Sequence, residues 1–212
     1  MENAQQLIDA VAEGDEARVV ELVKSFLEQD IPAGDILNDG LIAAMNLVGE
    51  LMEEEEIFIP EVLMAAKAMG AGVELIKPLL GEDSQFVKGK VVIGTVQGDL
   101  HDIGKNLVAM MIEGSGIEVC NLGVNVSVDA FLESVRNQHA SVVCMSALLT
   151  TTMPVMKQTI DALESSGLRD QVKVVIGGAS VTQNYADQIG ADGYAPDAGS
   201  AAKLVKSLLT GG

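Results

Sequence analysis

Two hydrophobic patterns divide the chain. Residues 3–80 place apolar side chains three and four positions apart, which is the spacing of amphipathic helices, and show no strand-like run. From residue 90 onward, short β-branched apolar runs alternate with amphipathic stretches of helix length. The stretch 81–89 between them is polar and flanked by glycines. The pattern therefore predicts a helical domain over 1–80, a linker over 81–89 and an α/β domain over 90–212.

The N-terminal pattern predicts a bundle of helices joined by short connections. The apolar stripes of the expected helices lie at 7–11, 19–27, 36–52 and from 61 to about 80. Asp15 suits the N-cap of the second helix, and Pro32 separates the second helix from the third. Pro60 suits the first turn of the fourth helix, because a missing N–H costs nothing there.

The C-terminal pattern predicts five strands that alternate with helices. The strands are expected at 90–96, 117–122, 141–147, 172–177 and 192–195. The helices are expected at 104–115, 128–138, 153–166, 181–189 and 198–209. Successive βα units predict a Rossmann-like parallel sheet with helices on both faces. The leading topology is the flavodoxin-like strand order 2-1-3-4-5, which opens a crevice between strands one and three.

This topology brings three loops to the carboxyl edge of the sheet. They are residues 98–106 after strand one, 146–152 after strand three and 177–180 after strand four. Small residues in the second and third loops leave room for an extended ligand. Gly177 and Gly178 could, however, simply be turn residues.

Composition narrows the function classes. The chain has 212 residues, of which 48% are hydrophobic and none is Trp, so its core is aliphatic. A net charge of −18 argues against nucleic acid, whose phosphates it would repel; it could aid docking on basic partner proteins or only maintain solubility. We expect no membrane partner and a cytoplasmic location, because no apolar run approaches the roughly 20 residues of a membrane span and no secretory signal is recognisable. Cys120 and Cys144 fall in predicted strands, as buried reduced thiols commonly do.

The first loop carries a histidine flanked by two acids, Asp99-Leu100-His101-Asp102. A metal-bound imidazole usually gives its second ring N–H to a carboxylate, for which Asp99 or Asp102 could serve. His139 ends a predicted helix and is expected to be an ordinary polar residue. With one other histidine and its cysteines in strands, the chain does not favour a tetrahedral zinc site built from protein alone. A metal held by a single imidazole must bring its other ligands with it, which indicates a macrocycle.

Three spaced motifs resemble the D-x-H-x-x-G…S-x-L…G-G signature of cobalamin-binding domains that bind the cofactor base-off. They lie at 99–104, 146–148 and 177–178. The preceding helices resemble the bundle that caps the corrin in methionine synthase and in the corrinoid proteins of methylotrophic methanogens and acetogens. The resemblance covers the whole chain, and it implies a four-helix cap followed by a flavodoxin-like corrinoid domain.

The resemblance implies roles for individual residues. His101 would be the lower axial ligand of cobalt, in place of the cofactor's own dimethylbenzimidazole, with Asp99 hydrogen-bonded to its far nitrogen. Thr152 stands where methionine synthase has the serine of this relay. The cofactor-binding loop would also include Gly98, Leu100, Asp102, Ile103 and Gly104. The slot for the nucleotide tail would be lined by Ser146, Leu148, Thr150, Gly177 and Gly178.

Two further regions complete the implied site. Residues 48–61 resemble the helix-turn-helix that covers the upper face of the corrin. Met52 and Ile59 stand where an aromatic and an aliphatic residue usually touch that face, although both could instead belong to the bundle core. The run of four glutamates at 53–56 departs from the family, which commonly has glycine in this turn. Ala198, near the last strand, would meet the buried base.

The implied function is that of a methyl carrier, a cofactor-bearing component and not a stand-alone enzyme. Its cob(I)alamin form would take a methyl group from a substrate held by a substrate-specific methyltransferase. Its methylcobalamin form would then pass the methyl group to a second methyltransferase that uses tetrahydrofolate or coenzyme M. A reductive activase is the third implied partner. Methylated or quaternary amines are favoured as methyl donors, while methanol and methoxylated aromatics remain possible.

Three other classes compete with this interpretation. A hydrolase triad could be drawn from Asp99, His101 and Ser146, but Ser146 does not lie in the G-x-S-x-G turn that exposes a nucleophile. A cobalamin-based sensor shares the binding motif but would need a DNA-binding region, which the acidity of the chain opposes. The small subunit of an adenosylcobalamin-dependent mutase shares the histidine loop but usually lacks the N-terminal bundle.

Overall fold

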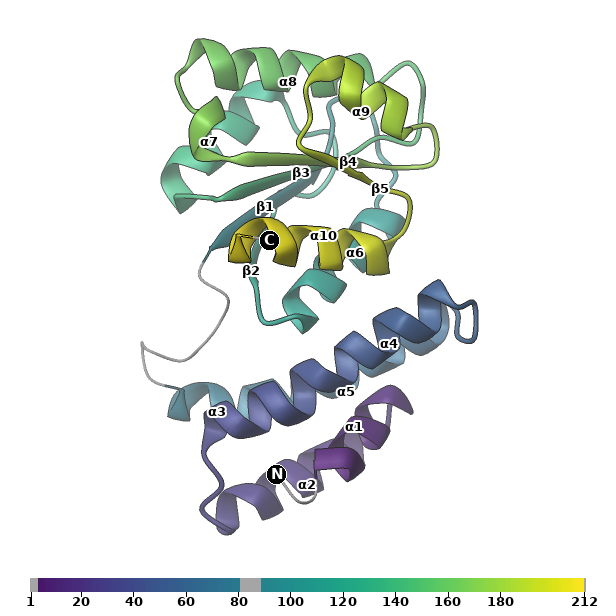
Figure 1. The fold of residues 1–212 in the computed structure, drawn as a ribbon, viewed down its shortest axis with the longest axis vertical. Coiled ribbons are helices and arrows are strands. Elements are labelled where there is room, and N and C mark those ends of the chain that lie inside the picture. The colour runs from purple at the N-terminus through teal and green to yellow at the C-terminus, as the bar shows by residue number, and fades with distance from the viewer. Residues whose placement is uncertain (1–3, 81–88, 212) are drawn as a thin grey trace. The chain divides into compact units, whose positions relative to one another are not determined.

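The computed structural model describes residues 4–80 and 89–211, and the chain separates into a helical unit and an α/β unit (Figure 1). The predicted linker 81–89 lies, apart from Gly89, outside the described residues. Within the described ranges, no helix combines the length and apolar character needed to cross a membrane.

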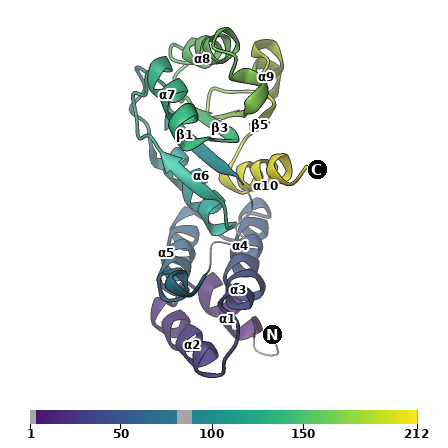
Figure 2. The same ribbon diagram turned by 90° about the vertical axis from the view of Figure 1, so that its left-hand side faces the viewer.

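The helical unit is a bundle with a mostly aliphatic interior. Its elements are α1 (Ala4–Ala12), α2 (Glu16–Glu28), α3 (Ala33–Asp35), a π-helix (Ile36–Ile42), α4 (Ala43–Glu53), α5 (Ile59–Ile76) and a 3-10 turn (Lys77–Leu79). α1 packs along α4, and α2 packs along α5 (Figure 2). Large side chains without exposed surface fill the interior, among them Leu7, Phe26, Leu37, Leu41 and Ile76. As predicted, Asp15 caps α2, where its side chain accepts the N–H of Arg18.

The third helix differs from the prediction, because a π-helical segment (Ile36–Ile42) separates its first turn, α3, from α4. Ile36, Leu37, Leu41 and Ile42 are all buried. At 3.6 residues per turn, Ile42 would point about 240° around the axis from Ile36 and away from the other three. The wider π turn lowers the rotation per residue and keeps all four side chains on the core side.

The fourth helix begins at Ile59, two residues earlier than the prediction. Pro60 lies in its first turn, as expected. The side chain of Glu61 accepts the N–H of Phe58 (3.1 Å), which satisfies one of the free backbone donors at the helix start.

The α/β unit confirms the predicted sheet. The strands are β1 (Lys90–Thr95), β2 (Glu118–Asn121), β3 (Val142–Ser146), β4 (Lys173–Gly177) and β5 (Gly193–Ala195). They are all parallel and follow the order β2-β1-β3-β4-β5. The helices are α6 (Ile103–Gly114), α7 (Val128–Gln138), α8 (Pro154–Ser165), α9 (Gln183–Ile189) and α10 (Ala198–Thr210), with a 3-10 turn at Arg169–Gln171. α7, α8 and α9 cover one face of the sheet, and α6 and α10 cover the other (Figure 1).

The central strands are apolar throughout because helices cover both faces. Val92, Val143 and Val174 form a row across β1, β3 and β4, and none of the three has exposed surface. They pack in one core with Phe131 of α7 and Met156 of α8. This packing holds the central strands in register.

Both cysteines lie in strands, as predicted. Cys144 of β3 is buried, and this burial raises the pKa of its thiol to about 12. Cys120 of β2 is partly buried, and neither forms a disulfide. Cys144 is therefore a packing residue that stays protonated at neutral pH.

The register aligns the strand ends that lead to the functional loops. One row of paired residues crosses the sheet at the strand ends. It contains, in order, Thr95 of β1, Ser146 of β3, Gly177 of β4 and Ala195 of β5. The following loops consequently leave from one edge. The strand order reverses between β1 and β3, and such a point opens a crevice at the carboxyl edge of a parallel sheet.

Candidate functional site

The buried carboxylate of Asp99 joins the loop after β1 to the loop after β3. Its Oδ1 accepts hydrogen bonds from Nδ1 (2.6 Å) and the backbone N–H (3.1 Å) of His101. Its Oδ2 accepts from the backbone N–H groups of Leu148 (2.8 Å) and Leu149 (3.2 Å) and from Oγ1 of Thr152 (2.8 Å). The side chain has no exposed surface. One carboxylate thus holds two loops together.

These hydrogen bonds keep the Asp99 carboxyl group ionised. Burial by itself raises the pKa of Asp99, but the hydrogen bonds from His101, Leu148 and Thr152 outweigh it and hold that pKa well below its usual range. Asp99 is therefore an anionic acceptor, and Nδ1 of His101 carries the proton. The second nitrogen, Nε2, has no hydrogen-bond partner in the described part of the chain. The His101 side chain is half exposed, so Nε2 is accessible to a ligand beyond the sheet edge.

Backbone contacts fix the loop that carries His101. Oγ1 of Thr95, at the end of β1, donates to the carbonyl of His101 (2.8 Å). Gly98 has φ +85°, which favours glycine, and its N–H donates to Oδ1 of Asn125 (2.8 Å). The N–H of Asn125 donates in turn to the carbonyl of Asp99 (3.0 Å). The loop therefore holds its shape through contacts with its own strand and with the loop after β2.

Asp102 does not share the role of Asp99. It is exposed, and its Oδ2 accepts from Nδ2 of Asn106 (3.1 Å) and not from the histidine ring. α6 begins at Ile103, one residue before the prediction, so Ile103 and Gly104 belong to its first turn. Of the two carboxylates that the sequence left open, the structure brings only Asp99 to His101.

Exposed apolar side chains gather on the loops around His101. Leu100 and Ile103 are 70% and 74% exposed, and Leu148 and Leu149 are 37% and 42% exposed. Apolar groups left in water beside a polar ligand commonly mark a binding surface. Among the residues that the structure describes, no three His, Cys, Asp or Glu side chains form a metal cluster. This donor set, one imidazole within an apolar rim, suits a metal in a large macrocycle.

Glycines let backbone pack against backbone in the third loop. Gly178 has φ +123°, and a Cβ added there would lie 2.1 Å from the carbonyl oxygen of Ala147. A Cβ on Gly177 would lie 2.9 Å from the carbonyl oxygen of Ala195. The N–H of Ala147 also donates to the carbonyl of Gly177 (3.2 Å). Both glycines therefore serve a close approach between strand ends.

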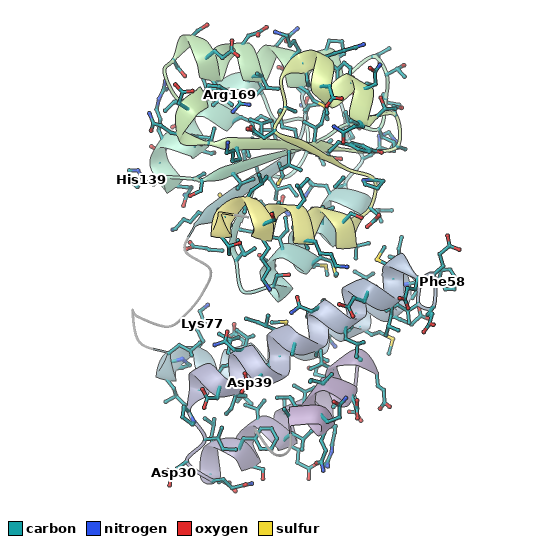
Figure 3. All side chains as sticks on the ribbon, viewed as in Figure 1. Asp30, Asp39, Phe58, Lys77, His139 and Arg169 are labelled. Carbon is teal, nitrogen blue, oxygen red and sulfur yellow. The ribbon has the colours of Figure 1, made fainter. Side chains whose placement is uncertain are left out.

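The remaining predicted residues lie as follows. Ser146 ends β3, and no hydrogen bond described in the structure joins its hydroxyl to His101, so the hydrolase triad has no support. Thr150 is exposed in the loop after β3. Ala198 is the buried first residue of α10. His139 ends α7 and leads into β3, at the amino edge of the sheet and away from these loops (Figure 3).

The helical unit has its own exposed apolar patch at the turn from α4 to α5. Phe58 (Figure 3) is 65% exposed, followed by Met64 (54%), Ile59 (41%) and Leu63 (40%). Met52, in the last turn of α4, is partly buried. Ile59 is therefore not a core residue of the bundle. Phe58 was not among the predicted residues, although it adjoins Ile59.

Comparisons with known proteins establish the family. A family model described as B12 binding domain matches residues 89–203, and a second model with the same description matches residues 4–77. The chain belongs to the B12-binding corrinoid proteins. It is 46% identical over 181 residues to dimethylamine corrinoid protein 1 of Methanosarcina acetivorans, with 85% of each chain covered.

Solved structures agree with this family. A cobalamin-binding protein from Desulfitobacterium hafniense is similar with a TM-score of 0.79 and 34% identity, over 95% of this chain and 96% of that one. The methanol:cobalamin methyltransferase complex MtaBC of Methanosarcina barkeri is similar with a TM-score of 0.88 and 32% identity, over 100% of this chain and 81% of that one. The predicted fold class and family are therefore confirmed for this corrinoid protein.

Several residues that shape the site were missed by the sequence analysis. Leu149 and Asn125 act through backbone and amide groups, and Ser180 bonds the carbonyl of Leu148. Lys105 is buried at the start of α6, where its Nζ donates to Oδ1 of Asn121 (2.7 Å). Lys105, Leu149 and Ser180 lie in loops that the sequence analysis placed at the carboxyl edge of the sheet, and Asn125 follows the carboxyl end of a strand that neighbours β1, but residue type alone did not single any of them out.

Replacing Gly178 with alanine should destabilise the corrinoid protein by about 2–4 kcal/mol, since the new Cβ overlaps the Ala147 carbonyl in a backbone conformation that suits only glycine. Gly167→Ala is the control: its φ is +70° but no atom lies within 4 Å of an added Cβ. That control should cost only about 1 kcal/mol. Urea denaturation measures the free energy of unfolding of both variants. Equal losses of stability would show that the contact with Ala147 does not explain why position 178 needs glycine.

Asp99→Asn should destabilise the corrinoid protein by about 2–3 kcal/mol at pH 7, because an amide cannot replace a buried anion that accepts five hydrogen bonds. Because the pKa of Asp99 is lower when folded than when unfolded, the wild-type advantage should shrink as the pH falls below about 4. Urea denaturation of both proteins between pH 7 and pH 3 measures this difference in the free energy of unfolding. Asp102→Asn, at an exposed carboxylate, should change stability by less than about 0.5 kcal/mol. If Asp99→Asn lost the same stability at every pH, Asp99 would not be ionised in the folded protein.

Proposed function

We propose that this corrinoid protein is a methyl carrier that binds its cofactor base-off, with Nε2 of His101 as the lower ligand of cobalt. The observation that carries the proposal is the contact between Nδ1 of His101 and Asp99 (2.6 Å). It fixes the tautomer whose free nitrogen is Nε2, and hydrogen bonding to a carboxylate makes an imidazole a stronger donor to a metal. The half-exposed ring lies among apolar side chains that suit the face of a corrin.

The chain's own residues hold and tune this ligand. Asp99 orients His101 and limits its movement, since the carboxylate is held by three further donors on Leu148, Leu149 and Thr152. Thr152 completes the proposed relay: its single hydroxyl proton has two acceptors, Oδ2 of Asp99 (2.8 Å) and the carbonyl of Leu149 (2.9 Å). When bound, the corrinoid supplies a cobalt centre that accepts and donates a methyl group.

We assign the nucleotide tail of the cofactor to the loops after β3 and β4. Ser146, Leu148 and Thr150 would line one side, and Gly177 with Gly178 the other. The packing of Gly178 on Ala147 supports this assignment, because it brings the loop after β4 against the loop after β3. Ala198, at the start of α10, would lie at the buried base of the cofactor.

We assign the helical unit to the upper face of the corrin, as a cap domain over residues 1–80 that a linker at 81–89 joins to the cobalamin domain over 90–212. Support comes from the exposed apolar side chains at the turn from α4 to α5. Met52 and Ile59 remain the proposed contacts, and we add Phe58, which can provide the aromatic surface that Met52 lacks.

The proposed partners are methyltransferases. The dimethylamine corrinoid protein of Methanosarcina acetivorans supports a methylated amine as methyl donor, and the MtaBC complex supports direct contact with a methyltransferase. A second methyltransferase would pass the methyl group to tetrahydrofolate or coenzyme M, and a reductive activase would maintain the reactive state. The net charge of −18 suits docking on basic partner surfaces.

Replacing His101 with alanine should weaken binding of hydroxocobalamin by about 10- to 100-fold and change the visible spectrum of the bound corrinoid, because the lower ligand is lost. His139→Asn is the control, since it changes the other histidine at a left-handed position that asparagine tolerates. Absorption titrations of both variants measure the effect. Unchanged affinity and spectrum in His101→Ala would show that His101 is not the ligand.

The donor proposal predicts that the reduced, cobalamin-loaded protein is methylated at least about tenfold faster by a dimethylamine-specific methyltransferase than by a methanol-specific one. A tenfold rate difference corresponds to about 1.4 kcal/mol of barrier. The appearance of the methylated cofactor spectrum, with each donor and its enzyme at equal concentration, measures both rates. Faster methylation from methanol would overturn the donor assignment but not the carrier role.

A further inference from the structure

A second hydrogen-bonded path reaches Asp99 from the loop after β4. Oγ of Ser180 donates to the backbone carbonyl of Leu148 (2.6 Å). The peptide group that contains this carbonyl also contains the N–H of Leu149, which donates to Oδ2 of Asp99 (3.2 Å). Ser180 is therefore connected to His101 through one peptide group and one carboxylate.

This path can change the strength of the Asp99 contacts. A donor on a peptide carbonyl polarises the group and makes its N–H a better donor, so hydrogen bonds in a chain reinforce one another. The Leu149 contact is the longest of the three to Oδ2. With more of its charge neutralised at Oδ2, Asp99 draws the Nδ1 proton of His101 less strongly.

The fold places Ser180 for this contact. The N–H of Val181 donates to the carbonyl of Gly178 (2.9 Å), which closes a tight turn around Ser180. The backbone of Gly178 packs directly on Ala147, the residue before Leu148. The hydroxyl of Ser180 is thus held at the Leu148 carbonyl by a turn whose position the glycine sets.

We propose that Ser180 is a positioning residue of the corrinoid site, which acts through the peptide group between Leu148 and Leu149 on Asp99 and thereby on His101. The inference rests on the proposed function of His101 as the cobalt ligand. It adds the loop after β4 to the loops after β1 and β3 as a part of the protein that sets the electron donation of the imidazole.

Proton NMR of the full chain without cofactor tests the proposal with Ser180→Ala. The amide proton of Leu149 should move upfield and exchange with solvent about fivefold faster, because its hydrogen bond weakens. The Nδ1 proton of His101 should move downfield, because Asp99 becomes a stronger acceptor. Ser180→Thr keeps a hydroxyl and should restore both resonances toward wild type.

Opposite shifts of the two protons separate polarisation from simple loosening of the loop. Loosening would move both upfield, and that result would overturn the proposal, as would two unchanged resonances. Ser166→Ala is the matched control, since Oγ of Ser166 donates to the Leu163 carbonyl (3.1 Å) at the end of α8, and it should leave both protons unmoved. An unchanged cobalt spectrum in His101→Ala would refute the ligand assignment alone, because the two resonances are measured without cofactor.

Discussion

The site depends on one buried anion. A carboxylate that loses all contact with water is strongly unfavourable unless its oxygens are fully hydrogen-bonded, so Asp99 can lie inside the fold only where five donors meet it. Three of those donors come from the loop after β3 and two from His101. The requirement to satisfy Asp99 therefore fixes the distance between two loops that are about 50 residues apart in the chain, and the same contacts orient the imidazole.

The sheet makes this arrangement possible. Thr95, Ser146 and Gly177 lie side by side at the ends of their strands, so the loops that follow start at one level. Gly178 lets the loop after β4 approach the backbone of Ala147, and Ser180 then reaches the Leu148 carbonyl. The apolar row of Val92, Val143 and Val174 keeps the strands in this register. A rigid aliphatic sheet thus supports a polar edge whose geometry has little freedom.

Much of this could be predicted from periodicity and motif spacing. The alternation of strands and helices predicted the strand order, and the position of His101 after β1 placed it at the carboxyl edge of the sheet, where the strand order reverses. The π-helix at the start of the third helix could not be predicted, because Ile36 to Ile42 form the same apolar run in either helix type. The residues alone left Asp99 and Asp102 both open as partners of His101, since both flank it in sequence; the resemblance to cobalamin-binding domains indicated Asp99, and the structure shows that contact. Leu149 acts through its backbone N–H, which almost any residue would supply, and the hydroxyl of Ser180 meets a backbone carbonyl, so neither pairing can be recognised from residue types.

The central claim is that Nε2 of His101, oriented by Asp99, binds cobalt. Electron paramagnetic resonance of the cobalt(II) form, prepared once with unlabelled protein and once with ¹⁵N-histidine, tests it most directly. If His101 is the ligand, the nitrogen splitting of the cobalt lines changes from triplets to doublets on labelling, and this effect is lost in His101→Ala but kept in His139→Asn. Triplets that persist in the labelled protein would show that the axial nitrogen belongs to the cofactor and would contradict the account.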